Sequence, residues 1–155
     1  MIDITRILSP QCVRVAVEAG SRKRVLHYSS DILAEAHPEL SARKVFDELA
    51  SRERLGSTGL GEGVAIPHCR IACKEIAGAF VALKTAVDYD AIDDQPVDLL
   101  FVLIVPPAET TAHLDLLAAL ARLFGEAENR RNLRNASSNS ELYEQLVGMF
   151  SAQAA

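Results

Sequence analysis

The stretch VDLLFVLIVP, residues 97–106, contains the most strongly apolar run of this 155-residue chain. Seven apolar residues, 99–105, follow one another without a polar side chain. A strand of this composition is buried on both faces, which is typical of the middle of a sheet that helices cover on either side. The run is too short to cross a bilayer. It therefore predicts a central strand of an α/β protein.

Before this strand, the pattern of apolar residues predicts two further strands and two helices. A serine stands where each helix begins, and a serine hydroxyl can accept a hydrogen bond from a free N–H group of the first turn. The His37-Pro38 pair ends the first helix, because proline cannot continue it. The predicted elements are a strand over 12–20, a helix from Ser21 to Ala36, a helix from Ser41 to near Leu55, and a strand over 76–87.

After this strand, the apolar pattern is helical throughout. Thr110 can cap a long helix that ends near Glu126, and shorter helices follow over 129–136 and 140–150. The last residues, 151–155, are expected to fray. Strands and helices in this order predict a central sheet with helices on both faces. The length of the chain suits a single domain over residues 1–150.

The composition is that of a globular protein with an ordinary core. Hydrophobic residues make up 49% of the chain, charged residues make up 24%, and the formal net charge is −5. A mildly acidic chain without a run of lysine or arginine does not suit nucleic acid. The start lacks the features of a secretion signal, and an odd number of cysteines argues against a disulfide scaffold. We therefore expect a cytoplasmic protein that neither binds nucleic acid nor inserts into a membrane.

A glycine-rich segment, LGSTGLGEGVAIPHCRI over residues 55–71, follows the second predicted helix. Glycine permits positive φ angles and lets a backbone approach a ligand, but the spacing matches neither a dinucleotide fingerprint nor a P-loop. Taken alone, the glycines indicate a flexible surface loop. Pro67 favours an extended conformation of Ile66, so the loop ends in a short extended piece that presents His68 in a defined place.

His68 is the first candidate functional residue. A neutral imidazole can serve as a nucleophile or as a metal ligand, although an isolated histidine is more often structural. Together with Cys69 and Cys73 it also suggests zinc. However, the spacing matches no paired-ligand pattern, and no fourth ligand is evident nearby. A role as small apolar residues suits the cysteines better.

Two further side chains could meet an anion. His113 would lie in the first turn of the helix after the apolar strand, where free N–H groups and the helix dipole favour negative charge. Arg52 precedes the glycine-rich segment, and its planar guanidinium suits phosphate oxygens. The plainer interpretations are an exposed histidine and a surface arginine that stabilises the end of its helix. Composition and position alone do not choose between them.

Three blocks of the sequence together resemble one protein family. They are RERLGSTGLGEGVAIPH over 52–68, DAIDDQPVDLLFVLIVP over 90–106, and TTAHL over 110–114. These blocks are similar to the type-2 IIA proteins of the bacterial phosphoenolpyruvate-dependent phosphotransferase system, the mannitol and fructose class, and most similar to its nitrogen-regulatory members. The resemblance implies a three-layer α/β/α fold with a central mixed β-sheet flanked by helices, shared with the cytoplasmic domains of anion transport proteins.

The resemblance also implies roles for individual residues. His68 matches the phosphorylated nucleophile, His113 matches the second active-site histidine, and Arg52 matches the arginine that stabilises phosphate. No metal and no other cofactor is implied. The residues that match the phosphate loop are Ser57, Thr58, Gly59, Gly61 and Gly63.

Two residues depart from the pattern of the family. Cys69 stands where glycine is most usual, and Glu62 stands where the nitrogen-regulatory members often have asparagine. Both departures bear on transfer rates and on partner choice more than on the chemistry.

The implied function is regulatory phosphoryl transfer. A histidine phosphocarrier protein would donate the phosphoryl group, and the phosphorylation state would control target proteins such as potassium transport components, kinases or metabolic enzymes. The sequence contains no transmembrane segment and no second phosphotransferase domain, so we expect a stand-alone regulator. The alternatives are a sugar-specific fructose or mannitol IIA component that passes phosphate to a IIB component, a non-catalytic binding module of the same fold, and a small zinc protein.

Overall fold

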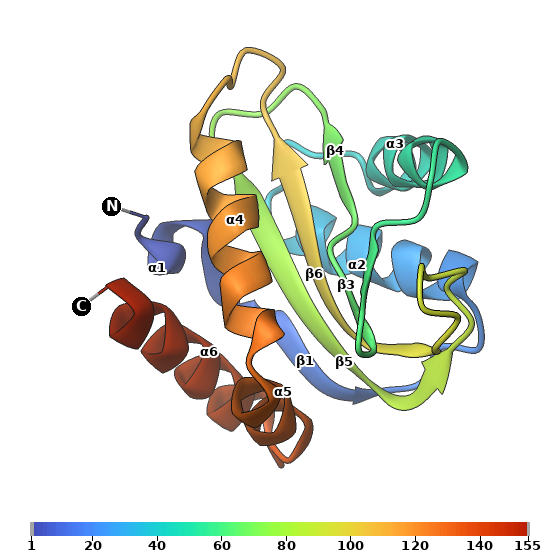
Figure 1. The fold of residues 1–155 in the computed structure, drawn as a ribbon. Coiled ribbons are helices and arrows are strands. Elements are labelled where there is room, and N and C mark those ends of the chain that lie inside the picture. The colour runs from blue at the N-terminus through green and yellow to red at the C-terminus, as the bar shows by residue number, and fades with distance from the viewer. Residues whose placement is uncertain (1, 155) are drawn as a thin grey trace.

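The structure, a computed structural model, describes residues 2–154 (Figure 1). The strands of this part of the chain form one mixed sheet in the order β1-β5-β6-β3-β2, and β4 also pairs with β6. The strands are β1 (Leu8–Val17), β2 (Gly59–Gly61), β3 (Val64–Ala65), β4 (His68–Arg70), β5 (Ala77–Val87) and β6 (Val97–Val105). The helices are α1 (Ile4–Ile7), α2 (Arg22–Ala36), α3 (Ala42–Arg54), α4 (Ala112–Gly125), α5 (Ala127–Arg134) and α6 (Asn139–Ala154).

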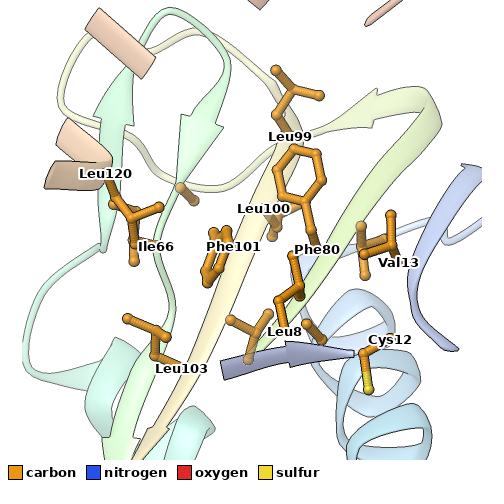
Figure 2. Close-up of a cluster of buried hydrophobic side chains, with 14 of the residues drawn as sticks. Leu8, Cys12, Val13, Ile66, Phe80, Leu99, Leu100, Phe101, Leu103 and Leu120 are labelled. Atoms are coloured by element: carbon orange, nitrogen blue, oxygen red, sulfur yellow. The ribbon is translucent and has the colours of Figure 1, made fainter. Parts of the chain in front are cut away.

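Strand β6 is the centre of the sheet, as the apolar run predicts. It pairs antiparallel with β5 on one side and parallel with β3 and β4 on the other, and every residue of it except Asp98 is buried. Figure 2 shows Phe101 of β6 beside Phe80 of β5, and their ring centroids lie 6.0 Å apart. Phe80 also stacks on Phe124 of α4, with 5.8 Å between centroids. These aromatic contacts hold α4 against the sheet.

Strands β3 and β4 are two halves of one extended segment that runs parallel to β6. Both halves keep the same register against β6, and His68 lies opposite Leu103. Ile66 and Pro67 separate the halves, and the Pro67 carbonyl still accepts a hydrogen bond from the Leu103 N–H group at 2.9 Å. His68 is therefore held in the sheet directly after a residue whose ring restricts φ.

Helices cover both faces of the sheet, which confirms the predicted three-layer α/β/α architecture. Helices α2 and α3 pack together on one face, whereas α4, α5 and α6 cover the other (Figure 1). The two serine caps are also confirmed. Ser21 Oγ accepts the Arg24 N–H group at 3.2 Å, and Ser41 Oγ accepts the Lys44 N–H group at 3.3 Å.

The first strand differs from its predicted range. It begins at Leu8 instead of residue 12 and so includes Pro10. Proline is tolerated there because β1 is an edge strand, in which a missing N–H group on the solvent side breaks no hydrogen bond of the sheet. It ends at Val17, next to Ala16, whose φ of 52° accompanies a shift of register against β5. Helix α1 precedes β1, and the Asp3 side chain caps it.

We predicted that Thr110 caps the long helix, and this prediction is wrong. The helix begins at Ala112, and Thr111 occupies the N-cap position without a side-chain cap bond. Glu109 provides the cap instead, because its Oε1 accepts the N–H groups of Thr111 at 3.1 Å and Ala112 at 2.7 Å. A carboxylate stabilises a helix N-terminus. It also occupies two amide groups that we expected to face an anion.

The last helix is longer than predicted. Residues 151–154, which we expected to fray, belong to α6. Gln153 Nε2 donates to the Ala119 carbonyl at 3.0 Å, so the final turn is tied to α4. Ala155 lies outside the described residues. Within residues 2–154, no helix is both long enough and apolar enough to cross a membrane.

Candidate functional site

His68 is half-buried at the start of β4, and one of its two ring nitrogens is already engaged. Nδ1 lies 2.8 Å from the Ile66 carbonyl oxygen. A carbonyl can only accept a hydrogen bond, so Nδ1 of the neutral ring carries the proton. The other nitrogen, Nε2, then keeps its lone pair. The backbone of the Ile66–Pro67 segment thus sets both the orientation and the tautomer of a potential nucleophile.

The environment of His68 favours its neutral form. Burial is the largest influence that holds the pKa of His68 below its ordinary value of 6.5. The hydrogen bond to Ile66 and the carboxylate of Glu53 act in the opposite direction, whereas the charge of Arg52, and that of His113 when its ring is protonated, lower this pKa further. At neutral pH the ring is therefore unprotonated at Nε2, as nucleophilic attack requires.

The titration of His68 should follow this direction. We expect the nuclear magnetic resonance signals of its ring to titrate with a midpoint below 6.5, because burial penalises the imidazolium. Acceptance of a phosphoryl group should then persist below that pH and fall only as pH drops through the lowered pKa. A peptide with the sequence AIPHCRI is the control and should titrate at the ordinary value. A midpoint at or above that of the peptide would contradict the assignment.

Arg52 comes to the site from the last turn of α3. Its Nη1 donates to the Gly56 carbonyl at 2.8 Å, which fixes the guanidinium across the start of the glycine-rich segment. Arg52 and His113, the other two residues predicted to carry the chemistry, lie near enough to His68 for their charges to lower its pKa.

Glu53 is a site residue that the sequence analysis missed. It lies in the last turn of α3, only 3% of its side chain is exposed, and it reaches the glycine-rich segment and the β5–β6 connection. Its carboxylate accepts the Tyr89 hydroxyl at 2.9 Å, the Thr58 N–H group at 3.2 Å, and the Thr58 hydroxyl. Arg22 Nη1 lies 3.8 Å from the same carboxylate and donates to the Tyr89 carbonyl at 3.2 Å. Glu53 therefore joins Thr58 to two other segments of the fold.

The loop residues predicted to surround phosphate have structural roles as well. Thr58 binds Glu53, and Ser57 Oγ donates to the Tyr89 carbonyl at 3.2 Å while it accepts the Gly59 N–H group at 3.1 Å. A Cβ atom at Gly59 would lie 2.8 Å from Cβ of Ala91, so the close approach of the β5–β6 connection requires glycine there. These bonds occupy the amide groups of Thr58 and Gly59.

The turn between β2 and β3 explains the remaining glycines. Gly61 and Gly63 have φ angles of 93° and 79°, and Glu62 between them has a φ of 58°. Glycine adopts such angles without strain, and asparagine tolerates them better than glutamate. The position that departs from the family pattern is therefore a left-handed turn position, where asparagine would be less strained.

His113 lies in the first turn of α4, as predicted, although the cap differs. Its Nε2 is 3.3 Å from Nη2 of Arg70, and its Nδ1 is buried without a hydrogen-bond partner among residues 2–154. Because Glu109 occupies the first amide groups of this helix, His113 itself is the group through which α4 could meet an anion.

The two cysteines after His68 do not share its surroundings. Successive residues of a strand point to opposite faces, and Cys69 is buried whereas His68 is partly exposed. Burial raises the pKa of the Cys69 thiol to about 12 and also raises the pKa of Cys73. Protonated thiols are poor metal ligands, so the structure favours the interpretation of Cys69 as a small core residue. Among residues 2–154, no cluster of three metal-ligating side chains is found.

Exposed apolar side chains lie close to these residues in the sequence. Leu55 is 86% exposed and follows the helix that carries Arg52, and Leu114 is 56% exposed and follows His113. Ile92 is 85% exposed and follows Ala91, which contacts the glycine-rich segment. Leu114 does not belong to the buried face of α4, which is formed by Leu116, Ala119, Leu120, Leu123 and Phe124. Exposed apolar side chains that lie together around a polar site would suit contact with another protein.

Comparison with known proteins defines the class. The sequence profile of the family described as "Phosphoenolpyruvate-dependent sugar phosphotransferase system, EIIA 2" matches residues 6–148. The chain belongs to this family, which confirms the resemblance found in the sequence.

Within this family, the chain is similar to nitrogen regulatory proteins. It is 44% identical over 154 residues to the nitrogen regulatory protein of Pseudomonas aeruginosa, an alignment that covers 99% of this chain and 100% of the relative. The crystal structure of nitrogen regulatory protein IIA-Ntr from Neisseria meningitidis matches with a TM-score of 0.86 and 40% identity, over 95% of this chain and 98% of that chain. The fructose-specific EIIABC component of Bacillus subtilis is 32% identical over 92% of this chain, which spans 23% of that protein.

Proposed function

We propose that this protein accepts a phosphoryl group on His68 from a histidine phosphocarrier protein, and that its phosphorylation state controls the binding of target proteins in the cytoplasm. The observation that carries the proposal is the state of His68. Its Nδ1 is fixed on the Ile66 carbonyl, its lowered pKa leaves Nε2 unprotonated, and Arg52 and His113 lie close enough to influence it.

The transfer step balances without a further reactant. Nε2 of His68 attacks the phosphorus of a phosphohistidine on the donor, and the donor's P–N bond breaks as the new P–N bond forms. The donor ring leaves as a neutral imidazole and keeps the proton on its other nitrogen. The His68 ring keeps its Nδ1 proton and becomes positively charged, so its hydrogen bond to the Ile66 carbonyl becomes charge-assisted and stronger.

Arg52 and His113 contribute by stabilising charge as the phosphoryl group passes. The group carries negative charge on three oxygens, and catalysis of such transfers rests on positioning and electrostatics. The Arg52 guanidinium is held by the Gly56 carbonyl, so its remaining N–H groups are preorganised. Preorganised donors stabilise a transition state without a cost of reorganisation during the reaction.

Arg52→Lys should slow phosphoryl acceptance by roughly ten-fold or more, because the substitution keeps the charge and removes the planar fork. Folding should change little, since the side chain is partly exposed. The measurement is rapid-quench transfer from the phosphorylated carrier. The matched control is Arg54→Lys in the same helical turn, whose guanidinium binds Ser51 Oγ at 3.1 Å. Equal rates for the Arg52 variant and the unmodified protein would remove Arg52 from the site.

A protein donor fits the surroundings of the site. A phosphohistidine on another protein must approach His68 together with the surface around it. Leu55, Ile92 and Leu114 expose apolar side chains on three segments that also carry or contact the site residues. Apolar side chains at the centre of an interface supply much of its binding energy, so these residues are suited to contact carriers and targets.

The regulatory alternative is favoured over the sugar-specific one by the comparisons. The chain is 44% identical to the nitrogen regulatory protein of Pseudomonas aeruginosa but only 32% identical to the fructose-specific relative. A phosphoryl group adds about −1.5 to −2 charges near neutral pH to a chain whose net charge is −5. A partner that packs apolar surface over unmodified His68 could bind the phosphorylated form only by desolvating the charge of the phosphoryl group. We therefore expect at least some targets to bind the free form more tightly.

The test compares the two forms directly. Free and phosphorylated protein are each used to capture partners from a cell extract, and calorimetry then measures the affinity of every captured protein for both forms. Stronger binding of the free form by at least one partner supports regulation. Identical partners and affinities would contradict it and favour a simple phosphate relay. A chain that takes up no phosphoryl group at all would favour the non-catalytic binding module.

A further inference from the structure

Arg70, the last residue of β4, joins this strand to the start of α4. Its Nη1 donates to three carbonyl oxygens of the β6–α4 connection: Pro106 and Pro107, both at 3.1 Å, and Glu109 at 2.7 Å. Its Nη2 lies 3.3 Å from Nε2 of His113. One side chain thus fixes the connection that leads into α4 and also contacts the histidine in the first turn of that helix.

The contact with Arg70 determines where the proton of His113 lies. A guanidinium has only donors and stays protonated in proteins. It can therefore bind Nε2 of His113 only when that nitrogen offers its lone pair. The neutral ring must then carry its proton on Nδ1, because the hydrogen bond at one ring nitrogen sets the state of the other.

The proton on Nδ1 has no acceptor within the described part of the chain. Nδ1 of His113 is buried and forms no hydrogen bond among residues 2–154. A buried donor without a partner is unfavourable, and such groups often mark sites where a ligand completes the bond. Arg70 contacts His113 and lies two residues after His68 on β4, so both side chains project from the same face of that strand. A phosphoryl oxygen on His68 is therefore the acceptor that the arrangement lacks.

We propose that Arg70 is a positioning residue that holds His113 in the Nδ1–H tautomer, so that Nδ1–H donates to the phosphoryl group on His68. The inference rests on the proposed function. The two histidines then use opposite nitrogens. His68 carries its proton on Nδ1 to bind the Ile66 carbonyl and attacks through Nε2, whereas His113 accepts from Arg70 at Nε2 and donates to phosphate through Nδ1.

The tautomer can be measured in the resting protein. Long-range proton–nitrogen correlation spectra of the neutral ring, recorded at alkaline pH, distinguish a protonated ring nitrogen from an unprotonated one. We expect His113 to be protonated at Nδ1. In Arg70→Met the donors are lost while the length of the side chain is nearly kept, and the proton should shift toward Nε2. Arg14→Met on β1, where the arginine Nε donates to the Gln11 carbonyl at 3.0 Å, is the control and should leave His113 unchanged.

The rate of transfer separates positioning from a general structural effect. Arg70→Met should slow transfer at saturating phosphorylated carrier by about ten-fold, a size typical when the group that orients a functional histidine is removed. The carrier concentration for half-maximal rate should stay unchanged. In a His113→Ala background the same substitution should have almost no further effect, because residues that act as a unit are not additive. Arg70→Lys should recover part of the rate if its ammonium group still donates to Nε2.

Two results would overturn the inference. One is the finding that His113 carries its proton on Nε2 in the protein without substitutions. This measurement needs no variant, so it does not depend on whether Arg70→Met folds. The other is full additivity of Arg70→Met and His113→Ala in folded proteins. Neither result affects the phosphorylation of His68. Conversely, a chain that takes up no phosphoryl group while His113 shows the Nδ1–H tautomer would refute the proposed function and leave the hydrogen bond to Arg70 in place.

Discussion

His68→Ala should abolish phosphoryl uptake from phosphoenolpyruvate and the upstream carriers, while His113→Ala should slow uptake without removing it. The methyl group of alanine offers no lone pair for attack, whereas loss of His113 removes one of several groups that stabilise charge. Radiolabelled phosphoenolpyruvate gives the amount of label on each variant. Label on the protein without substitutions should be lost in acid and retained in alkali, as expected of a phosphoramidate.

His27→Ala supplies the control for this experiment, because His27 is an exposed residue of α2 that stacks on Phe46 of α3 at 3.5 Å between centroids. Its uptake should match that of the unmodified protein. Normal uptake by His68→Ala would show that another residue accepts the phosphoryl group. Urea unfolding of each variant checks that a loss of phosphoryl uptake does not come from loss of the fold. We expect little change in stability, because a half-buried side chain that belongs to no buried hydrogen-bond network can be replaced at small cost.

Glu53→Ala should have the largest effect on stability among the site variants, a loss of about 3 kcal/mol in the free energy of unfolding. The substitution leaves the Thr58 N–H group, the Thr58 hydroxyl and the Tyr89 hydroxyl without their acceptor, and it leaves Arg22 without the nearby carboxylate. Transfer to His68 should also slow in the folded fraction, because the glycine-rich segment loses its attachment to α3. Urea unfolding monitored by circular dichroism gives the stability.

Two companion variants make the Glu53 prediction sharper. Tyr89→Phe removes one hydroxyl and should cost about 1 kcal/mol, the size of a single hydrogen bond. Glu48→Ala, an exposed glutamate in the same helix, should change stability by less than about 0.5 kcal/mol. If Glu53→Ala were no more harmful than Glu48→Ala, the buried carboxylate would not hold the loop in place.

The central strand and the helix caps could be predicted because their signals are local. The apolar run of β6 and the serines before α2 and α3 act within a few residues of where they stand. The cap of α4 was assigned to the wrong residue because Thr110 has the usual cap chemistry, while the carboxylate of Glu109 reaches the same amide groups from one residue earlier.

His68 could be predicted from the proline before it and from the resemblance, but its partners depend on the tertiary fold. Tyr89 lies 36 positions from Glu53 in the sequence, and His113 lies 43 positions from Arg70. No local pattern joins such pairs. One signal for Glu53 was available, because it continues the row of Val45 and Leu49 at helical spacing, where a carboxylate on the buried face needs partners.

The roles of the glycines also required the structure. The resemblance implied that they belong to a phosphate loop, and the structure gives them further roles: Gly59 accommodates Ala91, and Gly61 and Gly63 form the turn between β2 and β3. Glycine signals freedom of the backbone without revealing what uses it. Their contact with a phosphoryl group therefore stays a prediction that a phosphorylated structure would test.

Mass spectrometry of the intact protein, after incubation with phosphoenolpyruvate and the upstream carriers, tests phosphoryl transfer to His68 most directly. Peptide mapping under alkaline conditions, where a phosphoramidate survives, then locates the modified residue. We predict one phosphoryl group per chain, located on His68 and bound through Nε2, because Nδ1 is engaged by the Ile66 carbonyl. A protein that gains no mass when the carriers are active, or one whose phosphoryl group maps to another residue, would contradict the proposed function.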